Sequence, residues 1–199
     1  CTPRARTLSV THYLEWTLGE NRESSLMHIA SSWDTEAHAL MARNRYHPEY
    51  GNRVSFTSLS PPADSYTADR THFIGRNRSL SRPAAMERVS LSSRTGSALD
   101  PCSALQTVLE LAPGETAEII CITGQAESEL RARELILAYR STGAFENALE
   151  GTKAWWDVLL GGIEVDTPDY STNFLLNRWL LYQSLSCRMW GRSASYQSG

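Results

Sequence analysis

The sequence has little that would indicate a disulfide framework or a metal site. Its four cysteines, Cys1, Cys102, Cys121 and Cys187, are widely spaced and form no CxxC pair. This spacing disfavours both features and predicts a reducing compartment. The five histidines form no HxH or HxxxH pair, which leaves metal binding without support. GxSxG, P-loop and GxGxxG motifs are also missing, so several common enzyme classes lose their sequence signature.

The chain also lacks a long apolar run, a visible signal peptide and an excess of charge. No apolar segment approaches the roughly 18 residues that a membrane span needs. The formal net charge of -3 and the pI near 6.0 give no reason to expect nucleic acid or an anionic membrane as a partner. Lys153 is the only lysine, so the other 18 basic residues are arginine. A GC-rich genome explains that bias, and so do planar contacts to phosphate or carboxylate. The chain does not start with methionine, so we expect it to be a piece of a larger protein.

Residues 5–123 carry the patterns of β structure. The segment TLSVTHYLEW alternates strictly, with Leu8, Val10, His12, Leu14 and Trp16 on one face, which is typical of a half-buried antiparallel strand. The segment ELAPGETAEIICI predicts a hairpin with a Pro-Gly turn. Many short strands separated by turn residues predict a β-sandwich. Further strands are expected at Ser25–Ala30, Ala39–Asn44, Arg53–Ser58, Thr71–Ile74, Met86–Ser92, Leu105–Leu111 and Glu118–Ile122.

From Gln125 onward the pattern becomes helical. The first expected helix has its apolar stripe at Ala132, Leu135, Ile136 and Tyr139. The second has its stripe at Phe145, Leu149, Thr152, Trp156 and Leu159. On this helix, Trp155 and Trp156 either pack in a core or form an aromatic surface on which a sugar stacks. A third helix is expected at Asp169–Trp190, with Thr167 as its cap and Pro168 in its first turn. This last helix is apolar on most sides, so it needs neighbours, unless it is a loosely packed terminal helix.

The β region contains a basic stretch that could bind a ligand. Nine arginines and only four acids lie between Arg43 and Arg94, with tyrosine and phenylalanine interleaved. ARNRYHPEYGNR and FIGRNRSLSRPAA share Arg-Asn-Arg in a glycine-containing loop. Such loops suit sugar hydroxyls, phosphate or a subunit interface, and they are equally explained as solvated sandwich loops. The candidate binding residues here are Arg43, Asn44, Arg45, Arg76 and Arg78.

Five segments together resemble a known family. They are THYLEWTLGENRE, ARNRYHPEYGNRVSF, FIGRNRSLSRPAAM, LDPCSALQ and NRWLLYQSLSCRMWGRSASYQSG. They are similar to the phosphorylase part of cyclic β-1,2-glucan synthases and to 1,2-β-oligoglucan phosphorylases, in glycoside hydrolase family 94. The resemblance implies an antiparallel β-super-sandwich followed by linker helices and the first helix of an (α/α)6 barrel. Residues 1–123 would be the sandwich, 124–164 the linker and 165–199 the start of the barrel.

The resemblance also implies a chemistry, which is inverting phosphorolysis of β-1,2-glucan. Inorganic phosphate would be the co-substrate and no cofactor or metal would be needed. The general acid and the phosphate ligands of the family come after the segment matched here, so no catalytic residue is assigned and the 199 residues alone should be inactive. The matched C-terminal loop would contact the sugar, with Arg192 and Gln197 as donors or as structural supports. Its candidate binding residues are Arg192, Ser193, Tyr196, Gln197 and Ser198.

The same resemblance sets the expected partners and location. The partners would be a β-1,2-linked glucan or oligosaccharide, the rest of the barrel and a second copy in a homodimer, with no nucleic acid. The location would be cytoplasmic, or at the cytoplasmic face of the bacterial inner membrane if the protein is a synthase. Two alternatives stay open, a non-catalytic carbohydrate-binding or assembly sandwich and a different (α/α)6 hydrolase.

Overall fold

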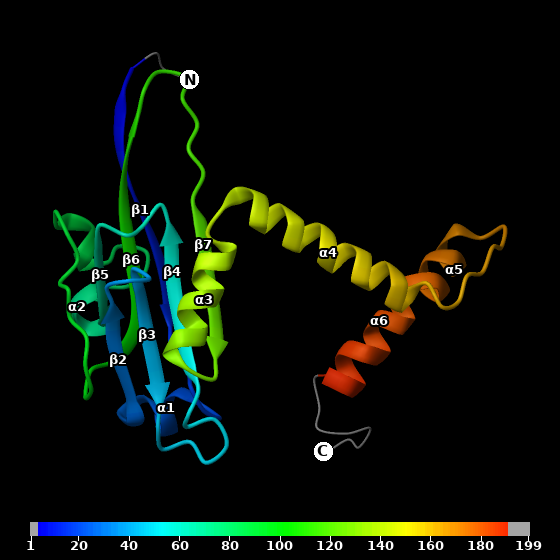
Figure 1. Ribbon diagram of the computed structural model, residues 1–199, viewed down its shortest axis with the longest axis horizontal. Helices are drawn as coiled ribbons and strands as arrows, with labels where there is room; N and C mark the ends of the chain where they lie inside the picture. The colour runs from blue at the N-terminus through cyan, green and yellow to red at the C-terminus, as the bar shows by residue number, and fades with distance from the viewer. Residues whose placement is uncertain (1–3, 191–199) are drawn as a thin grey trace. The chain divides into compact units, whose positions relative to one another are not determined.

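In the computed structural model, which describes residues 4–190, seven antiparallel strands form two sheets that pack face to face. One sheet has three strands in the order β1 (Arg6–Glu15), β6 (Pro101–Leu111) and β5 (Ser65–Asp69). The other has four, in the order β2 (Ile29–Asp34), β3 (Ala39–Asn44), β4 (Val54–Ser60) and β7 (Ile120–Ala126). The predicted β-sandwich is therefore confirmed (Figure 1).

Alternate residues of neighbouring strands fill the space between the sheets. Leu40 and Leu59 of the four-stranded sheet meet Ala68 and Leu105 of the three-stranded sheet, and all four side chains are buried. The hydroxyls of Thr57 and Ser103 share a hydrogen bond across the same layer. Burial of these apolar side chains drives the pairing of the sheets, and the hydroxyl pair avoids unsatisfied polar atoms inside.

Helix α3 (Glu129–Tyr139) covers the outer face of the four-stranded sheet. Its buried Ala132 and Ile136 pack on Met41, Val54 and Phe56. Ser128 caps its first turn by accepting a hydrogen bond from the backbone N–H of Arg131. The predicted apolar stripe of this helix is thus confirmed for Ala132 and Ile136.

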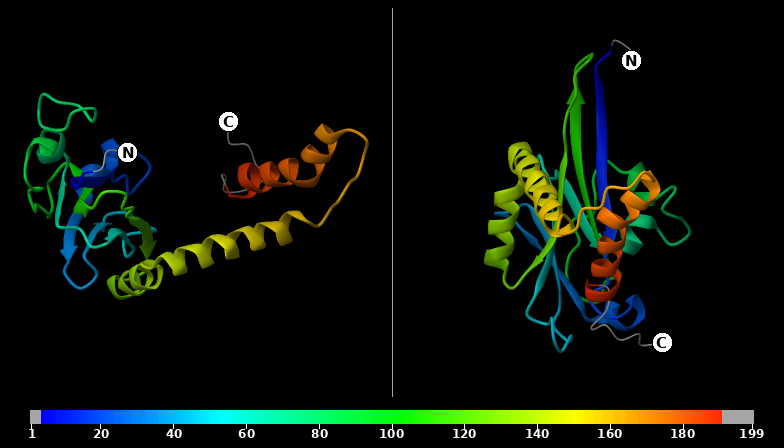
Figure 2. Two further views of the ribbon diagram at one scale, coloured as in Figure 1. Left: turned by 90° about the horizontal axis from the view of Figure 1, so that it is seen from above. Right: turned by 90° about the vertical axis from the view of Figure 1, so that its right-hand side faces the viewer.

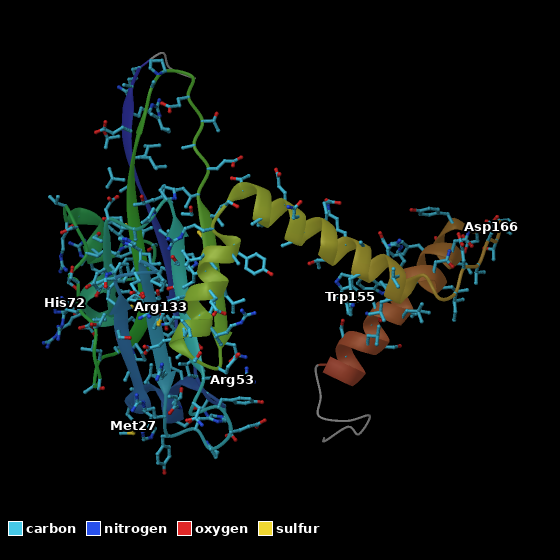
Figure 3. The ribbon with its side chains drawn as sticks, viewed as in Figure 1. Met27, Arg53, His72, Arg133, Trp155 and Asp166 are labelled. Carbon is cyan, nitrogen blue, oxygen red and sulfur yellow. The ribbon has the colours of Figure 1, made fainter. Side chains whose placement is uncertain are left out.

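Ion pairs also hold α3 against the strands. Arg133 Nε lies 2.7 Å from the carboxylate of the buried Asp34, and its Nη1 lies 2.9 Å from Glu36. Figure 3 shows Arg133 on the sheet side of the helix. At the other end, Arg140 donates to the carbonyl oxygen of Ala37. The partners of all three contacts lie at the end of β2 or in the β2–β3 turn. The ion pairs and the hydrogen bond therefore hold α3 against the edge of the sheet as well as against its face.

The first strand differs from the expected pattern of one buried face. Leu8 and Val10 are 42% and 38% exposed, because this half of β1 pairs with the end of β6 beyond the other strands. The two strands form a projecting ribbon in Figures 1 and 2. In the second half of β1 both faces are covered, since Tyr13 stacks on Phe73 and Leu14 packs against the cluster that contains Ile29 of the other sheet.

Two of the expected strands are wrong because side-chain caps begin short helices there. The segment Ser25–Ala30 instead contains the end of α1 (Arg22–Ser25), the 3-10 turn η1 (Leu26–His28) and the start of β2, and Asn21 caps α1 through the N–H of Ser24. The segment Thr71–Ile74 lies in α2 (Arg70–Ile74), capped by Asp69 through the N–H of His72. The strand before it, β5, was missed.

Two further expectations are also wrong. The segment Met86–Ser92 contains the end of the 3-10 turn η2 (Ala84–Glu87) and an irregular segment. The predicted hairpin around Pro113 does form a tight turn, with Gly114 at φ 79 and an N–H to carbonyl bond between Glu115 and Ala112. The strands on its two sides nevertheless belong to different sheets, because β6 pairs with β1 and β5, whereas β7 pairs with β4.

The chain divides into two compact units, residues 1–144 and 145–199. Helix α3 packs with the sheets of the first unit, whereas the sequence-based division placed it in a linker. The predicted domain bounds at 123 and 164 stay a prediction.

The second unit consists of helices. Helix α4 (Thr142–Leu160) begins at the end of the first unit. An extended connector leads to a continuous helical stretch, which consists of α5 (Tyr170–Phe174), the π-helical η3 (Leu175–Trp179), α6 (Leu180–Ser184) and the π-helical η4 (Leu185–Trp190). Asp169 caps this stretch by accepting from the N–H groups of Ser171 and Thr172, so the predicted cap at Thr167 is off by two residues.

Side chains of this stretch contact the connector and α4. The amides of Asn173 and Asn177 bond to the backbone of the connector at Thr167 and Val165. Arg178 lies 2.7 Å from Asp157 of α4. Many large apolar side chains of the unit are nevertheless exposed: Phe145, Leu149, Trp155, Val158, Leu159, Ile163, Tyr170, Phe174, Leu175, Leu176, Trp179, Leu180 and Tyr182.

Candidate functional site

The loop after β3 begins at the buried Asn44, whose amide is committed at both ends. Its Nδ2 donates to the carbonyl oxygen of Leu18 at 2.7 Å, and its Oδ1 accepts from the N–H of Tyr46 at 3.1 Å. The first bond ties the β3–β4 loop to the connection between β1 and α1. Asn44 therefore shapes the wall of this region and has little hydrogen-bonding capacity left for a ligand.

His47 organises the rest of the loop. Its Nδ1 accepts from the N–H groups of Glu49 and Tyr50 at 3.2 and 3.1 Å. The ring proton is therefore on Nε2, which leaves a donor on the outer side of the ring. The loop needs a glycine at position 51, because a Cβ on Gly51 would lie 2.7 Å from the carbonyl oxygen of His47.

A cavity of about 270 Å³ lies beside this loop. The guanidinium of Arg53 is 5.9 Å from the centre of the Tyr50 ring, a cation–π distance that restrains the arginine without using its N–H groups. Figure 3 shows Arg53 at the same end of the sandwich as Met27. The lining residues come from the β1–α1 connection, the β3–β4 loop, β4 and β7: Thr17, Leu18, Gly19, Asn44, His47, Tyr50, Arg53, Ser55 and Gln125.

The other two candidates from this loop have different surroundings. Arg43 lies 2.8 Å from Glu129 at the start of α3, so its charge already has a partner. Arg45 lines a second, open hollow together with Tyr46. The Tyr46 ring is 75% exposed and stacks on His28 with ring centres 4.3 Å apart. This pair presents a stiffened aromatic face next to the loop.

The second Arg-Asn-Arg segment lies in a different hollow. Arg76 lines an open hollow beside α2, together with His72, which is labelled in Figure 3. Arg78 lies 2.7 Å from Glu87 and Arg82 lies 3.0 Å from the same carboxylate. Hydrogen bonds from Arg78 and Arg82 lower the pKa of Glu87 to about 2. The two segments line hollows without a residue in common, so the structure does not join them into one site.

The candidates at the C-terminus, Arg192, Ser193, Tyr196, Gln197 and Ser198, lie outside the described residues. Their assignment stays a prediction.

A four-residue ion-pair network was missed from the sequence. Arg70 Nε lies 2.7 Å from Glu15 and its Nη1 lies 3.3 Å from Asp100, while Arg22 contacts the same two carboxylates. Burial would raise the pKa of Glu15, but hydrogen bonds from Arg70 and Tyr13 outweigh it and hold that pKa below its usual range. Burial and the bond to Glu15 raise the pKa of Tyr13. The groups are all paired with one another, which favours a structural role at this end of the sandwich.

Two kinds of site find no support in the part of the chain that the structure describes. Within residues 4–190 no three His, Cys, Asp or Glu side chains lie close enough together to hold a metal ion. Over the same residues, no helix combines the length and the apolar character that crossing a membrane requires.

Sequence comparison connects this sandwich and the helices after it to one family of carbohydrate-active enzymes. The model of the glycosyl hydrolase 94 supersandwich domain matches residues 2–142. The model of the glycosyl hydrolase 94 superfamily catalytic domain matches residues 155–199. The chain belongs to glycosyl hydrolase family 94.

Individual relatives carry names of synthases and phosphorylases. The cyclic beta-(1,2)-glucan synthase NdvB of Rhizobium meliloti (strain 1021) is 35% identical over 98% of this chain and 7% of its own length. The 3-O-beta-D-glucopyranosyl-beta-D-glucuronide phosphorylase of Paenibacillus borealis is 28% identical, over 98% of this chain and 25% of the relative. The N,N'-diacetylchitobiose phosphorylase of Vibrio furnissii is 27% identical, over 96% and 24%. The chain thus spans a quarter or less of the length of these relatives.

Proposed function

We propose that this chain is part of an enzyme that acts on β-1,2-glucan by inverting phosphorolysis, in cyclic β-1,2-glucan synthesis or in oligoglucan breakdown. The observation that carries the proposal is the match over nearly the whole chain to a cyclic beta-(1,2)-glucan synthase, at 35% identity. Phosphorylases that are named for other substrates match at 27% and 28%. The higher identity to the synthase supports β-1,2-glucan over the other substrates.

The exposed apolar helices support the expected architecture. Phe174 and Leu180 are 54% and 45% exposed on a helical stretch that falls within the match to the catalytic domain. Complete burial of such a side chain is worth roughly 1.5–3 kcal/mol. About half of that would still be gained here if further helices covered them, because each residue is about half exposed. In this proposal residues 165–199 begin an (α/α)6 barrel, and residues 124–164 connect it to the sandwich, with α3 in this connecting segment packed on the four-stranded sheet.

The proposed reaction needs one carboxyl group and one phosphate. Inorganic phosphate attacks the anomeric carbon from one side while a carboxylic acid protonates the leaving glycosidic oxygen, and the configuration is inverted. Phosphate takes the place of the water and base of an inverting hydrolase, so no cofactor is required. No carboxylate of this chain is assigned as the acid. Arg192 and Gln197 are proposed to donate to sugar hydroxyls, next to Ser193, Tyr196 and Ser198.

The test is an assay of the 199-residue chain with β-1,2-glucan and phosphate. We expect no glucose 1-phosphate, because the acid and the phosphate ligands would be supplied by other parts of the enzyme. Release of glucose 1-phosphate at a rate proportional to chain concentration would overturn the assignment of the acid to a place outside these residues.

Partners and location follow from the same proposal. A β-1,2-linked glucan, the rest of the barrel and a second copy of the protein are the proposed partners. The proposed location is the cytoplasm, or the cytoplasmic face of the inner membrane for a synthase.

A second candidate function is carbohydrate binding by the sandwich without catalysis. The exposed Tyr46 ring on His28 favours it, because sugars stack on such faces. Calorimetry with β-1,2-linked oligosaccharides tests it. Binding that Arg43→Ala and Arg45→Ala leave unchanged would remove these arginines from the site.

A further inference from the structure

Two of the hydrogen-bond acceptors that line the cavity beside the β3–β4 loop are already used. Asn44 Oδ1 and His47 Nδ1 already accept hydrogen bonds from backbone N–H groups. The hydroxyl of Tyr50 is committed to Glu49, a hydrogen bond that raises the pKa of Tyr50. The side-chain acceptors that remain in the lining are the hydroxyls of Thr17 and Ser55 and the amide oxygen of Gln125. Hydrogen-bonding capacity alone therefore does not select the ligand, and the charge of Arg53 decides which ligand the lining favours.

The lining is also positively charged. Within the described range 4–190 the Arg53 guanidinium forms no ion pair and no side-chain hydrogen bond, and it lies over the Tyr50 ring. No Asp or Glu is among the residues that line the cavity. An arginine held in place with its five N–H donors unused is suited to a planar or tetrahedral oxyanion.

Further donors lie around Arg53. One is the Nε2–H of His47. The others are the side chains of Ser55 and Gln125, and neither of these two forms a side-chain hydrogen bond with another described residue. The cavity volume of about 270 Å³ lies just below the range of pockets that hold drug-sized ligands, which leaves room for a small ligand.

We propose that this cavity binds a phosphate group, with Arg53 as its charged ligand and His47, Ser55 and Gln125 as neutral donors. The phosphate belongs either to inorganic phosphate or to a small phosphate monoester such as a sugar phosphate. This site lies in the sandwich unit and does not depend on the proposed phosphorolysis. Binding there would report the phosphate level to the protein without a chemical step.

Calorimetric titration of the 199-residue chain with inorganic phosphate, glucose 1-phosphate and glucose, at constant ionic strength, tests the proposal. We expect a Kd of about 1 mM or below for at least one phosphate probe, and no heat with glucose. Arg53→Gln should weaken binding by about tenfold or more, because it removes a charge-assisted hydrogen bond. Arg82→Gln makes the same charge change at a side chain that is 82% exposed and lies outside the cavity lining, and it should stay within about twofold of the wild type.

A second variant covers the case in which Arg53→Gln does not fold. Ser55→Asp places a carboxylate in the cavity and should abolish phosphate binding through repulsion and through pairing with Arg53. The backbone amide signals of Ser55 and Gln125 should shift on titration of the wild type. A phosphate affinity that falls equally in Arg53→Gln and Arg82→Gln would overturn the proposal. Phosphate binding that survives in Ser55→Asp, or binding of glucose alone, would also overturn it.

Discussion

Helix α3 is packed as part of the sandwich, which makes Ile136 the most informative position to change. The Ile136 side chain is 0% exposed and packs among Met41, Val54 and Phe56. Ile136→Ala removes three carbons, worth about 0.8 kcal/mol each in transfer free energy, and leaves a cavity in a layer that relaxes only partly. The better helix propensity of alanine offsets a few tenths of a kcal/mol. We expect a loss of about 3 kcal/mol in the unfolding free energy of the first unit.

Hydrogen exchange followed by mass spectrometry reads this loss in the sandwich itself. Peptides that cover β3 and β4 should exchange roughly a hundredfold faster in Ile136→Ala, if exchange occurs through unfolding of the unit. Leu137→Ala is the matched control, because Leu137 is 61% exposed on the same helix. Equal protection of these strands in both variants would refute the account, since α3 would then be a linker helix that the sheets do not need.

Two further changes test the packing and the ion-pair network. Gly124→Ala should lower the free energy of unfolding by about 1–3 kcal/mol, measured by urea denaturation, because its Cβ would lie 2.7 Å from the Phe56 ring. Gly143→Ala meets no atom within 4 Å and should be neutral or stabilising, so equal effects at both glycines would contradict the packing described. The lowered pKa of Glu15 means that its ionised form stabilises the fold above the unfolded pKa near 4.3, and that this contribution is lost as the pH falls through the folded pKa. The wild type should therefore exceed Glu15→Gln in urea midpoint at pH 7, and the difference should shrink below about pH 4; a constant difference down to pH 3 would argue against pairing with Arg70.

Local patterns predicted the strands that pair with near neighbours in sequence. Ala39–Asn44 was predicted with the bounds it has, because its residues are covered on both faces and its turn residues are local. The apolar stripe at Ala132 and Ile136 likewise reflects one helix against one sheet. Such segments need little information from elsewhere in the chain.

Other features depend on contacts that a single segment does not encode. The segment Thr71–Ile74, which was expected to be a strand, is helical because the Asp69 carboxylate accepts a hydrogen bond from the backbone N–H of His72. The ion-pair network joins Glu15, Arg70 and Asp100, which come together only after β1, β5 and β6 have paired. No local sequence pattern therefore predicts it. Sequence reasoning found the loop at Arg43–Arg45 from its composition, but Arg53, His47 and Gln125 become neighbours of one cavity only in the folded sandwich.

The substrate is the central claim, and a chimera tests it most directly. The 195 residues of the Rhizobium meliloti synthase that match this chain would be replaced by this chain, and glucose 1-phosphate release from β-1,2-glucan would be measured against that from β-1,4-linked glucan. The account predicts a folded chimera that releases glucose 1-phosphate from β-1,2-glucan in preference to β-1,4-linked glucan, and that loses most of this rate with Arg192→Ala. A folded chimera that is inactive on β-1,2-glucan, or that prefers another linkage, would contradict the proposed function.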